Sequence, residues 1–119
     1  MKKDNILLTK SYLFALRVVK LYIFLVNNQK EYVLSKQLLR SGTSIGANAE
    51  EAIGAQSRKD FKSKLSIAYK EARESHYWLR ILRDSEILES RIAESLLVDC
   101  EELQKIIGSI IKTLKNPNS

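Results

Sequence analysis

The sequence contains few residues that interrupt or cross-link a chain: one proline, four glycines and one cysteine in 119 residues. A single cysteine cannot form an internal disulfide, and a zinc site would need additional cysteine and histidine ligands, so we expect Cys100 to be a reduced thiol. Because 45% of the residues are hydrophobic, a chain of this length can bury a sufficient core without cross-links. The sequence therefore predicts one globular domain over residues 1–119.

The sequence also lacks an apolar run that would cross a membrane. From Tyr12 to Val26, 13 of 15 residues are apolar or aromatic, but Arg17 and Lys20 interrupt the run. A membrane-spanning helix needs about 20 residues with few or no charges, and no small-residue cleavage site of a signal peptide follows. We therefore expect a cytoplasmic protein without membrane contact.

The apolar residues recur at helical spacing. After Ser57, a predicted N-cap with Asp60 as the other half of a capping box, steps of four and three lead through Phe61, Leu65, Ala68, Ala72, Ser75, Leu79 and Leu82. A second series of such steps joins Ala93, Leu96, Cys100, Leu103, Ile107, Ile110 and Leu114. We predict an all-α protein, an antiparallel up-down four-helix bundle. Its helices are expected at about 5–27, 33–55, 58–84 and 90–115, the last ending at Asn116-Pro117.

The first predicted helix differs from the others because its apolar residues surround the helix axis. A helix that is hydrophobic on all sides must be covered on more than one side. In a bundle of this size, the cover on the far side can come from another subunit, and large exposed apolar patches mark interaction sites. The sequence therefore predicts a homo-oligomer.

Residues 41–57, SGTSIGANAEEAIGAQS, are rich in small side chains: 11 of the 17 are Gly, Ala, Ser or Thr. One interpretation is a phosphate-binding loop, but no Gly-Lys-Ser/Thr ending and no preceding strand accompany it. The favoured interpretation is close packing of two helices, with Gly42 and Gly46 one turn apart on the same face. Such packing must compensate for the low helix propensity of glycine.

Several polar residues are predicted to lie near the core. Ser41 and Asn48 share a heptad line with apolar residues of the second helix, and buried polar groups need partners. We predict a structural hydrogen-bond network formed by Arg40, Ser44, Asn48, Glu71 and Glu74. The alternative use of Glu71 and Glu74, a carboxylate metal site, is disfavoured because the only histidine, His76, falls on the opposite flank of the helix. One histidine and one cysteine on different helices also make a poor catalytic pair, so no enzyme, cofactor or metal is expected.

Basic residues exceed acidic ones by 20 to 14, which gives a net charge of +6. On the third predicted helix, one line without acidic residues contains Lys62, Ser66, Tyr69, Arg73, His76, Arg80 and Arg83. The start of the helix adds Arg58, Lys59 and Lys64. Cations with an interleaved aromatic ring suit phosphate contacts and base stacking on Tyr69. The alternative is an ordinary solvated helix face.

The middle of the sequence resembles a known family. The strings QLLRSGTSIGANAEEA and SRKDFKSKLSIAYKEARESHYWLRIL are similar to small proteins encoded in intervening sequences of bacterial 23S ribosomal RNA genes. The same family includes the accessory variability proteins of diversity-generating retroelements. The motifs that carry the resemblance are Ser44 to Glu51 and the series Ser57, Lys59, Phe61, Leu65, Ala68, Glu71, Ala72, Glu74 and Tyr77-Trp78-Leu79.

The resemblance implies a non-enzymatic four-helix bundle that assembles into a pentameric ring and has a basic surface for RNA or DNA. It also implies a reverse transcriptase or a ribosomal component as candidate protein partners. Arg17 and Lys20 would join the basic surface if they line the ring. We therefore predict a homo-oligomer that binds nucleic acid, with RNA favoured over DNA. The alternative is an adaptor that docks a partner polypeptide.

Overall fold

The structure is a computed structural model that describes residues 2–115, with all of their side chains except those of residues 3 and 4. It consists of four α-helices, α1 (Lys2–Asn28), α2 (Leu34–Ile53), α3 (Arg58–Asp84) and α4 (Ser90–Lys115), which confirms the predicted fold class. Each helix packs on its neighbours in sequence, and α4 also packs on α1. Within the described residues α1 and α3 make no contact, so they occupy opposite corners of the bundle.

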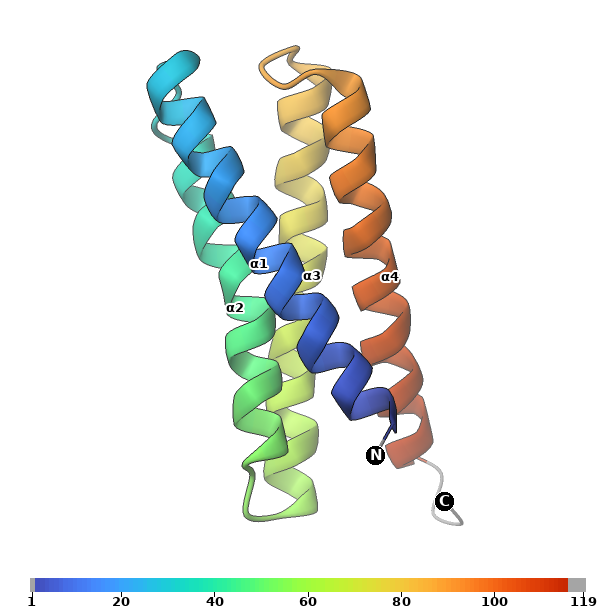
Figure 1. The fold of residues 1–119 in the computed structure, drawn as a ribbon. Coiled ribbons are helices and arrows are strands. Elements are labelled where there is room, and N and C mark those ends of the chain that lie inside the picture. The colour runs from blue at the N-terminus through green and yellow to red at the C-terminus, as the bar shows by residue number, and fades with distance from the viewer. Residues whose placement is uncertain (1, 116–119) are drawn as a thin grey trace.

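The helices form an elongated body of 50 × 21 × 20 Å. Figure 1 shows α1 crossing the front of the bundle obliquely, from α4 at its N-terminal end to α2 at its C-terminal end. The third helix lies behind α1 in this view, between α2 and α4. The fold therefore presents α1 and α3 on opposite sides of the molecule.

The helix ends follow from capping residues. The predicted N-cap Ser57 has extended backbone angles, and its Oγ accepts a hydrogen bond of 3.0 Å from the Asp60 N–H. Relative to the predicted bounds, α1 begins three residues earlier and α2 ends two residues earlier, at Ile53, where Gly54 caps the helix. The predicted helix stop at Asn116-Pro117 lies outside the described residues.

The start of α2 is capped by an acidic side chain that the sequence analysis did not single out. The Glu31 carboxylate accepts hydrogen bonds from the backbone N–H groups of Val33, Leu34 and Ser35, at 3.1, 2.8 and 2.7 Å. The first N–H groups of a helix have no partner within it. Glu31 supplies partners for three backbone donors, and its negative charge faces the positive end of the helix dipole.

The core is built from the two predicted series of α3 and α4. All of their members are buried except Phe61 and Leu114, which are half-buried at the ends of the bundle. The first helix contributes a third series in steps of four and three, which contains Leu7, Ser11, Phe14, Val18, Leu21 and Leu25. A continuous seam of this kind holds all four helices around one core.

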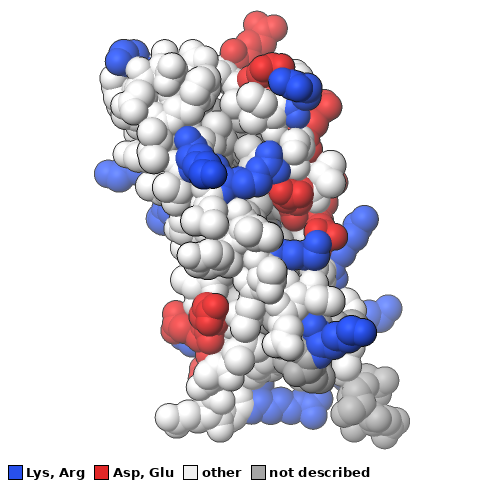
Figure 2. All heavy atoms as spheres, in the orientation of Figure 1, with Lys and Arg blue, Asp and Glu red and all other residues white. Residues whose placement is uncertain are grey.

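The opposite side of α1 exposes large apolar side chains, which we call the apolar α1 face: Ile6, Tyr12, Leu13, Leu16, Val19, Ile23 and Phe24. Tyr12 is 63% exposed and Leu13 is 54% exposed. In Figure 2 the surface over α1 is largely white, with basic side chains along its right margin. The predicted distribution of apolar residues all round the first helix is thus present in the structure, with one side buried and the other open to solvent.

The small residues of α2 lie where α1 crosses it. A Cβ atom added to Gly42 would lie 2.9 Å from Val18 Cγ2, and one added to Gly46 would lie 3.4 Å from the Ser11 carbonyl oxygen. The segment 41–53 is continuous helix. The structure therefore agrees with the close-packing interpretation of residues 41–53, and only residues 54–57 of the segment form a loop.

Candidate nucleic-acid interface

The side of α3 that faces away from the core carries a row of basic residues. We call this row the outer α3 face: Lys59, Lys62, Ser66, Lys70, Arg73, Tyr77 and Arg80. Its five cations are exposed, and within the described residues none of them forms an ion pair or a hydrogen bond with a protein group. At 1.5 Å per residue the row is about 32 Å long.

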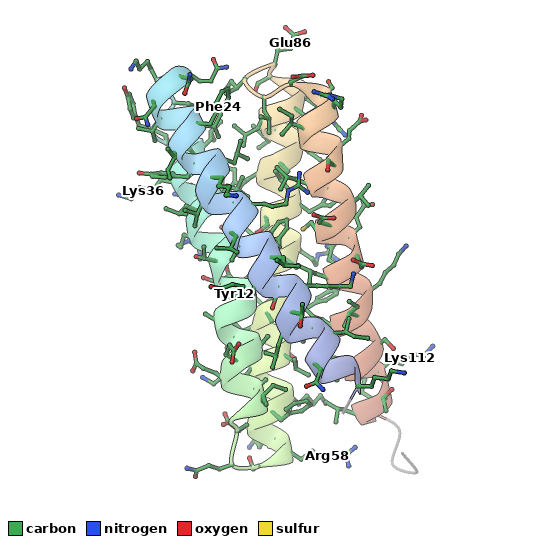
Figure 3. The ribbon with its side chains drawn as sticks, viewed as in Figure 1. Tyr12, Phe24, Lys36, Arg58, Glu86 and Lys112 are labelled. Atoms are coloured by element: carbon green, nitrogen blue, oxygen red, sulfur yellow. The ribbon has the colours of Figure 1, made fainter. Side chains whose placement is uncertain are left out.

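No carboxylate lies on the outer α3 face between Lys59 and Arg80. The acidic residues Glu71 and Glu74 of the same helix are turned toward α2, where both bind Arg40. Arg58 lies at the start of α3, at the lower end of the bundle in Figure 3, where it donates a hydrogen bond of 2.8 Å to the Leu114 carbonyl oxygen. The five cations therefore form a surface without a carboxylate between them, and Asp84, one turn after Arg80, is the nearest negative charge beyond its end.

Three members of the predicted basic line face α4 instead. His76 Nε2 lies 2.8 Å from Glu101 Oε2 of α4. Arg83 donates from Nε to Asp84 Oδ1 of its own helix at 2.8 Å, and the charge of Glu94 of α4 contributes to raising the pKa of Arg83. Tyr69 is half-buried against the core beside Gly108. The structure thus places Tyr69, His76 and Arg83 away from the free cations, because α4 packs along this flank of α3.

Three further predicted residues are also separate from the outer α3 face. Lys64 faces α2 and pairs with Glu51 at 3.3 Å. Arg17 of α1 pairs with Asp99 at 2.6 Å, and Lys20 is exposed on the same helix. Because α1 and α3 occupy opposite corners, Arg17 and Lys20 lie on the other side of the bundle from the outer α3 face of the same chain.

The structure adds two residues that the sequence analysis missed. Lys70 and Tyr77 lie at the centre of the outer α3 face and are both exposed. Both residues could have been identified from the sequence, because they lie on the side of the helix opposite the buried series from Leu65 to Leu82. The predicted basic line is displaced from this line toward α4.

The predicted polar network forms in part. Arg40 Nη1 donates to Glu71 Oε2 at 3.1 Å, Arg40 Nη2 donates to Glu74 Oε1, and Trp78 Nε1 also donates to Glu74 Oε1, at 3.2 Å. The hydrogen bond from Arg40 is the main cause that lowers the pKa of Glu74, and it also raises the pKa of Arg40. This cluster joins α2 to α3 on the outside of the bundle.

Ser44 and Asn48 do not reach this cluster. Ser44 Oγ donates to the Arg40 carbonyl oxygen at 2.6 Å, and Asn48 Nδ2 donates to the Ser44 carbonyl oxygen at 2.8 Å. Both residues therefore satisfy their polar groups on the backbone of their own helix. A buried contact not included in the predicted network links the same two helices, since Ser75 Oγ donates to Ser41 Oγ at 2.9 Å.

The residues with catalytic potential are occupied in structural contacts. Burial raises the pKa of the Cys100 thiol to about 12, with a further contribution from Glu101 and Asp99, and Cys100 donates to the Ala72 carbonyl oxygen at 3.1 Å. A thiol in this state is a poor nucleophile. Within residues 2–115, no three His, Cys, Asp or Glu side chains gather as metal ligands. Among the described helices, none is long and apolar enough to cross a bilayer.

The fold and these contacts define a small up-down helical bundle with one basic face and one apolar face. Over residues 3–109 the sequence matches the family described as 23S rRNA-intervening sequence protein, and the chain belongs to this family. A solved structure from Bacteroides thetaiotaomicron, a protein with unknown function from the S23 ribosomal protein family, is 56% identical to the chain. It superposes with a TM-score of 0.91 over 92% of this chain and 98% of the other. No curated protein matches the sequence.

Proposed function

We propose that the protein binds nucleic acid through the outer α3 face. The observation that carries this proposal is the row of five exposed cations, Lys59, Lys62, Lys70, Arg73 and Arg80, without a carboxylate among them. Lysine and arginine that neutralise phosphates release the condensed counterions of a nucleic acid, and this release drives binding. The net charge of +6 adds a long-range attraction for a polyanion.

Structured RNA is the nucleic acid that we favour. The name of the family connects its members with an intervening sequence of 23S rRNA. A straight row of cations about 32 Å long reads phosphate positions rather than base sequence. We therefore expect recognition of RNA shape with little sequence preference, and no enzymatic step.

We further propose that the active form is a homo-oligomer held together by the apolar α1 face, as a pentamer by resemblance to the family. The apolar α1 face is open to solvent in the single chain, whereas isolated soluble chains rarely expose apolar patches of this extent. Because α1 lies opposite α3, the apolar α1 face and the outer α3 face of one chain do not overlap. Five copies would multiply the number of phosphate contacts.

Charge reversal on the outer α3 face tests the proposal. The triple variant Lys62→Glu, Arg73→Glu, Arg80→Glu removes three free cations. In wild type we expect the logarithm of the affinity for a fluorescent single-stranded RNA to fall with log salt by about 0.7 per phosphate contacted. In the variant we expect at least a tenfold weaker affinity at 50 mM salt and a slope flatter by about 2, measured by fluorescence anisotropy.

The matched control is the triple variant Lys36→Glu, Lys105→Glu, Lys112→Glu. It changes the net charge by the same amount at exposed lysines of α2 and α4 that lie off the outer α3 face. We expect it to retain most of the affinity. Equal losses in the two triple variants would contradict a localised site, and absence of RNA and DNA binding by wild type at 50 mM salt would contradict the function itself.

The apolar α1 face also supports a second candidate function, the docking of a partner polypeptide. Beside this face a groove of about 250 Å³ between α1 and α4 is lined mainly by apolar residues, Leu21, Phe24, Leu88, Ile92 and Leu96, with Arg17 and Lys20 at its edge. A segment with apolar anchors could fill such a groove. An intact oligomer that binds no nucleic acid would favour this adaptor function.

A further inference from the structure

We propose that Tyr77 is a stacking site for an unpaired nucleobase, so that the outer α3 face selects single-stranded segments and loops over continuous duplex. This inference rests on the proposed function, because it specifies which part of a nucleic acid the same face binds. The sequence pattern assigned stacking to Tyr69, which is half-buried in the structure. Tyr77 is 49% exposed and lies between the free cations Arg73 and Arg80.

The ring of Tyr77 is held in place by its neighbours. Trp78 meets it edge to face, with the ring centroids 5.2 Å apart and an interplanar angle of 65°. Trp78 is in turn fixed by its hydrogen bond to Glu74, which Arg40 also binds. A ring that is already ordered loses little conformational entropy when a ligand stacks on it.

The charges around Tyr77 match the backbone of a single strand. The Arg80 guanidinium lies over one face of the Tyr77 ring, 5.7 Å from its centroid, which leaves the other face for a base. Arg73 and Lys70 lie one and two turns earlier on the same side of α3. A base placed on the exposed part of the Tyr77 ring therefore has cations on both sides for its flanking phosphates. Arginine next to an aromatic ring is a recurring platform for single-stranded nucleic acid.

A continuous duplex cannot use this platform. Its bases are stacked on one another and paired, so their faces do not reach a side chain on a straight helix. Unpaired bases in loops and ends present their faces freely. Base stacking should therefore increase the affinity for single strands but not for duplexes, whereas phosphate contacts contribute to the affinity for both.

The test compares three probes that share a phosphate backbone: a single-stranded DNA dodecamer, the same strand with every nucleoside replaced by an abasic tetrahydrofuran unit, and the corresponding duplex. We expect wild type to bind the base-bearing strand at least fivefold more tightly than the abasic strand, since stacking on an aromatic side chain is worth roughly that factor or more per base. The base-bearing strand should also change the fluorescence of Trp78, the only tryptophan, more than the abasic strand does.

Substitutions then test whether the preference for the base-bearing strand over the abasic strand depends on Tyr77. Tyr77→Ala should bring the ratio of the two affinities close to one without changing the salt dependence, and Tyr77→Phe should retain the ratio. Tyr32→Ala is the matched control, because Tyr32 is 57% exposed and lies outside α3.

The possible outcomes separate the two proposals. Equal wild-type affinity for base-bearing and abasic strands, tighter binding of the duplex than of the single strand, or an unchanged ratio in Tyr77→Ala would overturn the stacking site and leave phosphate binding standing. Failure of all three probes, and of a single-stranded RNA of the same length, to bind at 50 mM salt would overturn both proposals.

Discussion

The distance between α1 and α2 is set by residues with very small side chains. Gly42 lies against Val18, whose side chain is fully buried, and Gly46 lies against the backbone of Ser11. Valine has little rotational freedom about χ1 in a helix, so it cannot turn away from an added atom. The stability of this crossing therefore depends on the absence of a Cβ atom at residue 42.

Gly42→Ala should lower the free energy of unfolding. The new Cβ would lie 2.9 Å from Val18 Cγ2 and 3.0 Å from Cγ1, so α1 and α2 must separate to admit it. We expect a net loss of about 1–3 kcal/mol, as for other overpacked cores. Urea unfolding followed by circular dichroism measures this loss.

Gly108→Ala is the matched control for this substitution, since both glycines lie inside long helices. A Cβ at residue 108 would lie 3.7 Å from Tyr69 Cε1, which is an ordinary contact. The alanine should therefore stabilise the protein by up to about 1 kcal/mol through helix propensity. A Gly42→Ala variant as stable as wild type would show that the two helices can move apart without cost.

At the scale of the helix, the N-terminus of α2 depends on one carboxylate. Partial burial of Glu31 acts to raise its pKa, but the hydrogen bonds from Leu34, Ser35 and Val33 together lower it below the ordinary value of 4.5. A carboxyl group whose pKa is lowered by folding stabilises the folded state above its unfolded pKa. That contribution is lost as the pH falls through the folded pKa.

Glu31→Ala should therefore cost about 1 kcal/mol of unfolding free energy at pH 7, as the loss of an N-cap does. The difference from wild type should shrink as the pH falls below about 4.5, because wild type then loses the charged acceptor. Thermal unfolding between pH 3 and pH 7 gives both quantities. Glu50→Ala, at an exposed residue of the same helix, is the control, and a difference that stays constant with pH would contradict the capping role.

The sequence was sufficient to predict the core seams and most helix ends, because both depend on local physics. Steps of four and three from Leu65 to Leu82 place those side chains on one side of a helix, and Ser57 caps its own helix without help from distant residues. By contrast, the residues that contact the two flanks of α3 depend on how α2 and α4 pack against it. The spacing of residues within α3 does not predict that Glu101 of α4 lies beside His76. Nor does it predict that Glu51 of α2 lies beside Lys64.

The same reason explains why the predicted basic line was displaced. The line from Lys62 to Arg83 is free of acid along the helix, but α4 covers part of it. Tyr69 and Arg83 are therefore partly buried, whereas Lys70 and Tyr77 are exposed. Only the position of both neighbouring helices identifies the outer side of α3. The Arg40 contacts with Glu71 and Glu74 could be predicted, because helices joined by a short loop pack side by side.

At the scale of the whole molecule, the apolar α1 face and the outer α3 face lie on opposite sides of the bundle. Within one chain the two faces therefore do not overlap. This arrangement allows the two proposed properties, self-association and nucleic-acid binding, to be changed independently by substitution. A loss of both through changes on α1 would mean that binding requires several outer α3 faces at once.

The double variant Leu13→Glu, Ile23→Glu should dissociate the oligomer. Both side chains are more than half exposed in the single chain, so the helix and the core should remain intact. Covering the two carboxylates with an apolar surface would remove their hydration, which opposes association. In sedimentation velocity we expect wild type at a multiple of the 13.6 kDa chain mass, about fivefold for a pentamer, and the variant at 13.6 kDa.

Val98→Glu is the control, because Val98 is an exposed apolar residue of α4 with 64% of its surface accessible. It should leave the sedimentation of the oligomer unchanged. A wild-type chain that sediments as a monomer, or a double variant that keeps the wild-type mass, would argue against association through α1.

The order of the helices around the bundle also has a consequence for folding kinetics. Three of the four helix interfaces join helices connected by loops of four or five residues, whereas α1 and α4 meet only over long separations, such as the 82 residues between Arg17 and Asp99. Closing a short loop loses less chain entropy than closing a long one, and predominantly local contacts favour fast folding. The helical hairpins should therefore form first, and the junction of α1 with α4 should be the last to close and the first to open in the native protein.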